Sequence, residues 1–253
     1  MRNFLMFIGF ALCFSNCKKE PTISFATEIF EVESKQNCHE TACSRVYLEI
    51  PKAIGNENIT SPINQKIYDY FKEELTFLNA PRTNSYDSLA YFFIQEYEKT
   101  SATYPENYPL WQANFEVEHQ KISERLYQIV WNFNVYTGGA KGSFGTKVFF
   151  FDLKTGKEVP AMELFVNYPG FVDYSRSEFM HQLKIGNNQD LEEQGFNITK
   201  EDFRLPDNFY LANNQWLLFY NPSEITAAYK GAVLIQLPKD KVSVFLNPIY
   251  FKS

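Results

Sequence analysis

The chain has 253 residues, of which 45% are hydrophobic and 21% are charged, and its formal net charge is −6. This balance excludes a disordered chain, and the lack of a basic block argues against nucleic acid as a partner, because phosphate neutralisation needs clustered lysine and arginine. Aromatic residues make up 17% of the chain, which favours β-sheets with broad apolar contacts over a coiled coil.

Residues 1–16 are typical of a secretory signal peptide. Arg2 supplies the positive charge at the start, and residues 4–14 form an apolar run that is too short for a transmembrane helix. The run ends directly before Cys17, and Lys18 and Lys19 follow at once. The sequence therefore predicts cleavage in front of Cys17.

A cysteine placed in this way resembles the lipidated cysteine of bacterial lipoproteins, and Asn16 before it fits the looser pattern of Bacteroidetes-type lipoproteins. We expect Cys17 to carry lipid, palmitate included, because two or three acyl chains anchor a protein stably in a membrane. Residues 17–22 would form a short tether. The alternative is an ordinary secreted protein with a free cysteine near its start.

Two alternating segments, residues 23–33 and residues 44–50, predict a pair of strands, the second ended by Pro51. The turn between them contains Cys38 and Cys43. Export places these cysteines in an oxidising compartment, so we expect a disulfide that closes the hairpin. The alternative is a metal site formed by Cys38, His39 and Cys43, which lacks an obvious fourth ligand.

Two helices follow. Ser61 could cap a helix with Pro62 in its first turn, and apolar residues continue at helical spacing to Leu78, before Pro81. A second helix is expected from Tyr86 to about residue 100, with Ser85 as its cap.

Strand patterns then dominate. Residues 111–122, 125–136 and 144–153 predict an antiparallel meander. The rest of the prediction consists of a short helical turn at residues 162–165, a helix over 170–184, a hairpin of residues 209–211 with 216–220, a helical turn at 222–229, a strand over 231–237 and a last short helix from Pro238. The fold class is α+β, with antiparallel sheets and packed amphipathic helices.

The glycine-rich segment of residues 138–145 is a candidate binding loop. It lacks the spacing of a phosphate-binding loop, and the next element is a strand, so a hairpin loop with positive φ angles is the favoured interpretation. If the loop does bind a partner, the candidate residues are Tyr136, Gly138, Gly139, Lys141 and Phe144.

Other motifs point to structure. Asp152 and Gly156, in Asp-Leu-Lys-Thr-Gly-Lys, are expected to form a turn in which the carboxylate bonds the backbone and the glycine is left-handed. The three histidines, His39, His119 and His181, are not at metal-ligand spacing. Glu116 and Glu118 share one face of a strand, and a solvated surface is expected there. We predict no catalytic constellation, no metal and no cofactor.

Several stretches resemble a known family. Four of them together resemble the domain of unknown function 3298. These are Tyr136 to Gly142, the run Asp-Leu-Lys-Thr-Gly-Lys at 152–157, Leu164-Phe165, and the stretch from Leu217 through Asn221-Pro222 to Pro238. Tyr47 to Pro51 and residues 63–67 resemble its companion, the domain of unknown function 4163. The resemblance implies a 4163-like α+β domain at residues 23–135 and a 3298-like α+β domain at residues 136–253.

These domains occur in the lysozyme-binding extracytoplasmic part of the anti-sigma factor RsiV and ahead of the catalytic domain of some peptidoglycan deacetylases. Many relatives carry histidine where this chain has Lys141, so no role of that histidine is carried over. An anti-sigma factor needs a cytoplasmic segment and a membrane span, and only 16 residues precede Cys17, so we do not expect that activity.

Two functions stay open. We expect a monomeric, non-catalytic lipoprotein of the cell envelope that acts in binding or sensing. We expect its anchor to lie in a membrane outside the cytoplasm, namely the outer membrane. Its partner would be a lysozyme-like protein or a peptidoglycan glycan. The alternative is an envelope hydrolase that acts on peptidoglycan or another glycan.

Overall fold

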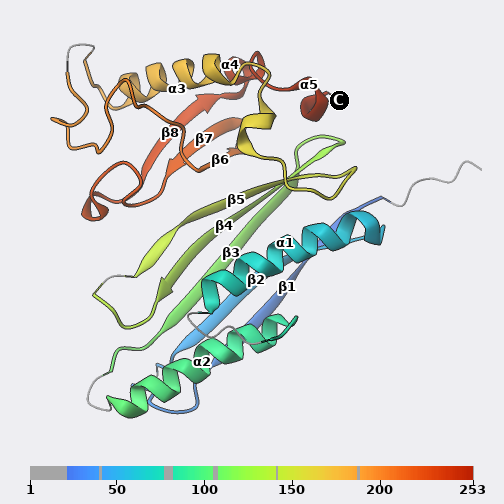
Figure 1. Ribbon diagram of the computed structural model, residues 1–253, viewed down its shortest axis with the longest axis vertical. Coiled ribbons are helices and arrows are strands. Elements are labelled where there is room, and N and C mark those ends of the chain that lie inside the picture. Colours follow the sequence, from blue (N-terminus) through green and yellow to red (C-terminus); the bar gives the residue numbers. More distant parts are fainter. Residues whose placement is uncertain are drawn as a thin grey trace, which may run out of the picture.

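The computed structural model describes residues 22–39, 42–76, 82–104, 108–140, 142–186 and 189–252. The predicted signal peptide, Cys17 and Lys141 lie outside these described residues. The chain folds into two sheets with helices packed against them (Figure 1). This arrangement confirms the α+β class.

The larger sheet has five strands in the order β1-β2-β3-β4-β5. Two helices, α1 and α2, connect β2 to β3 and cover one face of the sheet (Figure 1). The elements are β1 (Ser24–Glu33), β2 (Arg45–Ile54), α1 (Glu57–Leu75), α2 (Tyr86–Thr103), β3 (Gln112–Lys121), β4 (Leu126–Tyr136) and β5 (Ser143–Asp152).

The smaller sheet has three antiparallel strands in the order β6-β7-β8, with α3 and the C-terminal helices beside it. The 3-10 helices are named η. The elements are η1 (Ala161–Leu164), α3 (Tyr168–Gln182), β6 (Asn208–Ala212), β7 (Gln215–Tyr220), η2 (Ala228–Lys230), β8 (Val233–Pro238), α4 (Lys239–Ser243) and α5 (Pro248–Phe251).

The chain has two hydrophobic clusters, one on each side of β4 and β5. Alternation places Ile129 and Trp131 in the cluster beneath α1 and α2. The opposite face of the same strands contributes Leu126 and Phe150 to the cluster of the smaller sheet and α3. The strands β4 and β5 are therefore covered on both faces, whereas α1 and α2 leave one face of β1–β3 uncovered.

The larger sheet differs from the prediction in two ways. It is mixed, because β2 pairs with β3 in parallel over residues 45–48. The long crossover through α1 and α2 makes a parallel connection feasible, which a short hairpin does not. The sheet also continues across the predicted domain boundary at residues 135 and 136, since β5 pairs with β4 along its whole length.

Pro51 does not end β2, which runs on to Ile54. The carbonyl of Glu49 accepts a hydrogen bond from the Trp131 indole at 3.0 Å, so the backbone groups of alternate residues here point away from β1. Pro51 shares that direction, and the pairing with β3 has already stopped at Leu48. Its missing N–H therefore costs no ladder hydrogen bond.

The first helix begins earlier than predicted. Asn56, not Ser61, caps α1, because its side chain accepts from the backbone N–H of Asn58 at 3.1 Å. Pro62 consequently lies inside the helix. The second helix agrees with the prediction, since Ser85 caps α2 through the N–H of Ser88.

The smaller sheet agrees closely with its predicted parts. The hairpin of β6 and β7 turns at Asn213 and Asn214, both with positive φ. The predicted helical turn over 222–229 is reduced to η2 at Ala228–Lys230, and α5 was not predicted. Among the described residues, no helix is long and apolar enough to cross a membrane.

Candidate functional site

The uncovered face of β1–β3 is the most distinctive surface of the larger sheet, and we call it the open face. The alternation that places Val46 and Leu48 in the core turns the neighbouring side chains to solvent. The open face includes Ile29, Glu31 and Glu33 from β1, Arg45, Tyr47 and Glu49 from β2, and Asn114, Glu116 and Glu118 from β3.

The open face is strongly acidic. It holds five glutamates and one arginine, and the arginine is already engaged, because Arg45 Nη2 lies 2.6 Å from Glu31 Oε1. Its Nε lies 3.9 Å from Glu33 Oε1. Both Glu116 and Glu118 are exposed, as expected for a solvated face.

Tyr47 reports the negative potential of the open face. Its hydroxyl donates to Glu49 Oε1 at 2.8 Å. This hydrogen bond raises the pKa of Tyr47, and the negative charges of Glu49, Glu116 and Glu31 raise it further. Three strands therefore direct their carboxylates towards one region, which favours a positively charged partner.

A second polar cluster lies where β2 and β3 separate. Thr27 Oγ1 is hydrogen-bonded to His119 Nε2 at 3.0 Å, and His119 Nδ1 to the Tyr127 hydroxyl at 2.7 Å. The ring of Phe25 stacks on Tyr127 with centroids 3.7 Å apart. These contacts connect β1 to β3 and β4 beyond the end of the parallel pairing.

Burial lowers the pKa of His119 and raises the pKa of Tyr127 to about 12. The imidazole is therefore neutral at pH 7 and could accept a proton from Thr27. The Thr27 hydroxyl, the His119 imidazole and the Tyr127 hydroxyl that orients it are hydrogen-bonded in a row, which is the order of groups found in nucleophilic catalysis. No local sequence pattern marks this cluster, because Thr27 and His119 are 92 positions apart.

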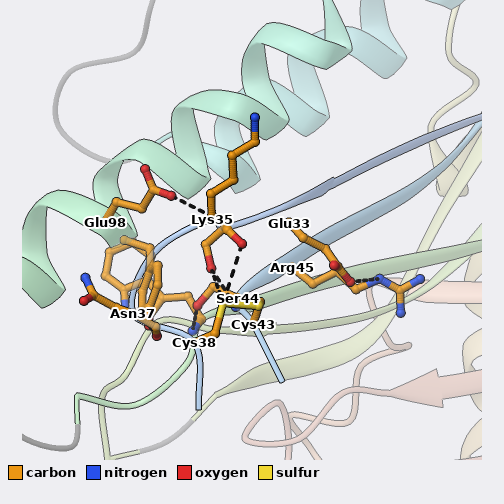
Figure 2. The surroundings of a disulfide bond; sticks show 11 residues. Glu33, Lys35, Asn37, Cys38, Cys43, Ser44, Arg45 and Glu98 are labelled. Carbon is orange, nitrogen blue, oxygen red and sulfur yellow. Dashed lines mark hydrogen bonds and ion pairs between the residues drawn. A yellow bond between two sulfur atoms is a disulfide. The ribbon is translucent and has the colours of Figure 1, made fainter. Parts of the chain in front are cut away.

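The predicted disulfide is present. Cys38 and Cys43 are bonded and close the turn between β1 and β2 (Figure 2). The metal alternative is therefore wrong, because a disulfide leaves no thiolate to bind a metal. Among the described residues, no group of three potential ligands could hold a metal ion.

The turn is also fixed to neighbouring elements. The Lys35 N–H donates to Glu98 Oε1 of α2 at 3.0 Å, and the Tyr97 hydroxyl donates to the Asn37 carbonyl at 2.6 Å (Figure 2). Ser44 N–H donates to Ser34 Oγ at 3.1 Å across the base of the turn. These hydrogen bonds hold the β1–β2 turn against α2, and the disulfide closes the same turn, so its role is structural.

The glycine-rich segment joins β4 to β5 as a hairpin loop. Gly138 has a φ of 80°, and a Cβ there would lie 3.1 Å from the indole nitrogen of Trp111. Phe144 is 53% exposed on the same face as Asn134, and Gly139 is also exposed. Tyr136 is half-buried at the end of β4. A binding role of this loop stays a prediction.

The comparison with known families bears on the second half of the chain. Residues 164–240 match the family described as protein of unknown function (DUF3298). The resemblance to the DUF3298 family is confirmed. The match runs from the end of η1 to the start of α4 and so contains α3 and the whole smaller sheet. The resemblance of the first half to the companion domain 4163 stays a prediction.

Solved structures of DUF3298 family proteins share the fold. One from Bacteroides fragilis is 18% identical, with a TM-score of 0.71, and the alignment covers 92% of this chain and 98% of that one. Another from Pseudomonas aeruginosa is 15% identical, with a TM-score of 0.60, and covers 92% and 99%. No curated protein matches this chain.

Proposed function

We propose that this chain is a non-catalytic binding or sensing lipoprotein of the cell envelope, and that its open face binds a basic protein of the lysozyme type. The observation that carries the proposal is the presence of five glutamates from three strands on one face of the sheet, which none of the described helices covers. The resemblance to domains that also occur in the lysozyme-binding part of RsiV supports the choice of partner.

The electrostatics favour a protein partner over a neutral glycan. Complementary charge accelerates association and selects partners, and it does so most strongly at low salt. A glycan would instead need exposed aromatic rings to stack on, and Tyr47, the aromatic residue of this face, is engaged by Glu49 and lies 5.3 Å from the Arg45 guanidinium.

Binding to lysozyme tests this proposal. We expect the purified chain to bind hen lysozyme, and the triple variant Glu33→Gln/Glu116→Gln/Glu118→Gln to bind about tenfold more weakly in low salt, because each charge contributes up to roughly 1 kcal/mol. These three substitutions do not change either partner of the Tyr47–Glu49 hydrogen bond. Calorimetric titration at two salt concentrations gives both affinities.

A matched control separates this face from net charge. The variant Glu73→Gln/Glu192→Gln/Glu193→Gln removes the same charge from exposed positions on α1 and on the segment before β6. We expect it to bind lysozyme as the wild type does. Equal weakening of both triple variants, or no binding by the wild type, would refute a specific acidic docking face.

The membrane anchor is proposed from the sequence and has its own test. We expect the mature N-terminus to be an acylated Cys17 and the protein to sediment with outer membranes. Mass spectrometry of the N-terminal peptide measures the acylation. A Cys17→Ser variant should move to the soluble envelope fraction, and an unmodified Cys17 in the wild type would contradict the anchor.

A hydrolase is the second candidate, favoured by the hydrogen-bonded cluster of Thr27, His119 and Tyr127. In that case peptidoglycan or another glycan would be cleaved, and Thr27→Val would abolish turnover while leaving the fold intact. Release of free amino groups from purified peptidoglycan measures cleavage of its amide bonds, which is the reaction that a hydroxyl–imidazole pair supports. Turnover that survives Thr27→Val would exclude this cluster as its source.

A further inference from the structure

The outer edge of β1 is a free edge of the larger sheet. The strand pairs with β2 over its whole length, and no other described strand lies beside it (Figure 1). It contains no proline, and its pairing with β2 is unbroken by a β-bulge. Natural proteins usually protect a long edge strand by such features or by a covering segment. This edge therefore offers a regular template to another strand.

The backbone groups that face the free edge belong to alternate residues. The Ser34 N–H donates to the Ser44 carbonyl at 2.8 Å next to the end of β1, so the even-numbered residues of the strand point to β2. The odd-numbered residues, from Phe25 to Glu33, therefore direct their N–H and C=O groups outwards. Within the described part of the chain, these outward groups have no hydrogen-bond partner.

The side chains of the same odd-numbered residues lie on the open face and are acidic towards the end of the strand. Ile29 is 60% exposed, and Glu31 and Glu33 follow it. Arg45 lies 2.6 Å from Glu31 but 3.9 Å from Glu33. Because β1 contains three glutamates and no basic residue, a second copy of β1 would bring like charges together, whereas a basic strand meets opposite charges.

On the other face of the sheet, an open groove of about 630 Å³ lies between β1 and α2. Val32 of β1 lines it and no residue of β2 does, so the groove borders the free edge. From α2 it receives Tyr91, which is 57% exposed, and Phe92. A strand added to β1 would place alternate side chains in this groove and the remaining ones over the open face.

We propose that the free edge of β1 accepts an extended segment of a basic partner as an additional antiparallel strand. The backbone of that segment bonds the outward groups of β1, its basic side chains lie beside Glu31 and Glu33, and its apolar side chains enter the groove beside Val32 and Tyr91. The basic character of the partner rests on the proposed function, whereas the strand addition rests on the free backbone groups.

The test uses a synthetic eight-residue peptide in which lysine and valine alternate. We expect it to bind the purified chain saturably in low salt, as measured by the fluorescence anisotropy of the labelled peptide. A peptide of the same composition, with all lysines placed before all valines, should bind about tenfold more weakly. Only the alternating order puts the lysines on one face of an added strand and the valines on the other.

N-methylated peptides test the backbone pairing itself. In an antiparallel strand, the residues that share the open face with Ile29 also turn their N–H groups towards β1. Methylation of the lysine amides should therefore weaken binding about tenfold, and methylation of the valine amides should leave it unchanged. Weakening by the valine amides alone would still show strand addition, in the parallel direction. Equal effects of the two methylations would overturn the proposal.

A proline variant tests the edge from the side of the protein. The Ile29 N–H points outwards, so Ile29→Pro removes a donor to the added strand and no hydrogen bond to β2. We expect this variant to bind the alternating peptide about tenfold more weakly. The matched control Ile29→Thr keeps the N–H and a β-branched side chain, and should bind as the wild type does. Thermal unfolding checks the fold, and the methylated peptides decide if Ile29→Pro unfolds.

Lysozyme separates this proposal from the proposed function. Binding of the alternating peptide without binding of lysozyme would support the strand site and reject the proposed partner. Binding of lysozyme without binding of the peptide would overturn the strand site and leave the acidic docking face in place. A folded Ile29→Pro protein with the wild-type affinity for the peptide would also overturn the strand site.

Discussion

At the scale of single residues, the turn after β5 shows how neighbouring groups determine the charge state of one side chain, Asp152. Asp152 accepts from the backbone N–H of Lys154 at 2.9 Å and from Arg125 at 2.7 Å. Burial raises the pKa of Asp152, but the hydrogen bonds from Arg125 and Lys154 outweigh it, and the net pKa lies below its usual value. The carboxylate is therefore ionised and structural.

Gly156 closes this turn, and its substitution gives a prediction. It has a φ of 72°, and a Cβ would lie 2.1 Å from the carbonyl oxygen of Ile59 at the start of α1. We expect Gly156→Ala to lower the free energy of unfolding by about 3 kcal/mol, from the left-handed conformation and the displaced backbone together. Denaturant titration measures the loss.

Gly231→Ala is the matched control for Gly156→Ala. Gly231 also has a positive φ, 78°, but a Cβ there meets nothing within 4 Å. Only the conformational cost should remain, which is about 1–3 kcal/mol because its ψ of −164° lies in a region essentially reserved for glycine, so this loss should be the smaller of the two. Equal losses in the two variants would show that the contact between this turn and α1 contributes nothing.

His119 gives a pH-dependent prediction. Because burial lowers its pKa in the folded state, the unfolded chain binds the proton more readily as the pH falls through about 6.5. The contribution of His119 to stability is therefore complete above that pH and decreases below it. We expect His119→Gln to reduce the slope of unfolding free energy against pH between about 6.5 and 5.

His181→Gln provides the control for that slope. The His181 side chain is 83% exposed. We expect this variant to keep the wild-type slope. A His119→Gln protein with the wild-type pH dependence would argue against a neutral, buried His119.

At the scale of elements, the β1–β2 connection is fixed by a covalent bond and by contacts with α2. The Cys38–Cys43 loop spans a sequence separation of only five residues, so the bond restricts the unfolded chain little. We expect Cys38→Ser/Cys43→Ser to lose about 2 kcal/mol of unfolding free energy. Adding reductant to the wild type should give the same loss, and the variant should not respond to reductant.

The exposed edge of β5 is protected by side chains instead of by another strand. Asn221 accepts from the Thr146 N–H at 2.8 Å and donates to the Thr146 carbonyl at 3.0 Å. Asn208 accepts from the Val148 N–H at 3.0 Å. Gly145 allows this approach, because a Cβ there would lie 2.3 Å from Asn221 Oδ1. The asparagines of the smaller sheet thus pair with the edge of the larger one.

We expect Asn221→Ala to lower the unfolding free energy by about 2 kcal/mol, because both backbone groups of Thr146 lose their partner. Asn134→Ala, at an exposed position of β4, should change it by less than about 0.5 kcal/mol. Thermal unfolding compares the two. A small effect of Asn221→Ala would mean that water replaces the amide at this edge.

At the scale of the whole molecule, the two sheets are joined by direct polar and apolar contacts. The buried Gln128 of β4 accepts from the Leu211 N–H at 2.7 Å and donates to the Leu211 carbonyl at 3.0 Å, and Gln120 also donates to this carbonyl. Leu126 and Phe150 belong to the cluster of the smaller sheet. The halves therefore share polar and apolar contacts.

This sharing predicts a single unfolding transition for the wild type. Far-UV and near-UV circular dichroism should report the same midpoint, and the calorimetric and van't Hoff enthalpies should agree. Gln128→Ala would leave the Leu211 N–H without its partner and should lower the midpoint for both signals together. Two separate transitions would show that the sheets unfold independently.

The sequence by itself determined most of the local structure. Period-two alternation in residues 111–136 predicted the meander, the two asparagines at 213 and 214 predicted a tight hairpin, and Ser85 marked the start of α2. The disulfide followed from two cysteines on one short turn of a chain that is predicted to be exported. These features depend on neighbours in the chain, which is why a local pattern suffices.

Only the tertiary structure decided how distant strands meet. The parallel pairing of β2 with β3 puts Glu31 and Glu33 on the same face of the sheet as Glu116 and Glu118, with β2 between the two pairs, although the sequence offered only the second pair as a shared face. The cluster of Thr27 with His119 likewise joins segments that are 92 residues apart. A long crossover connection does not fix which strand a β-strand pairs with or in which register, and the packing of the whole core determines both.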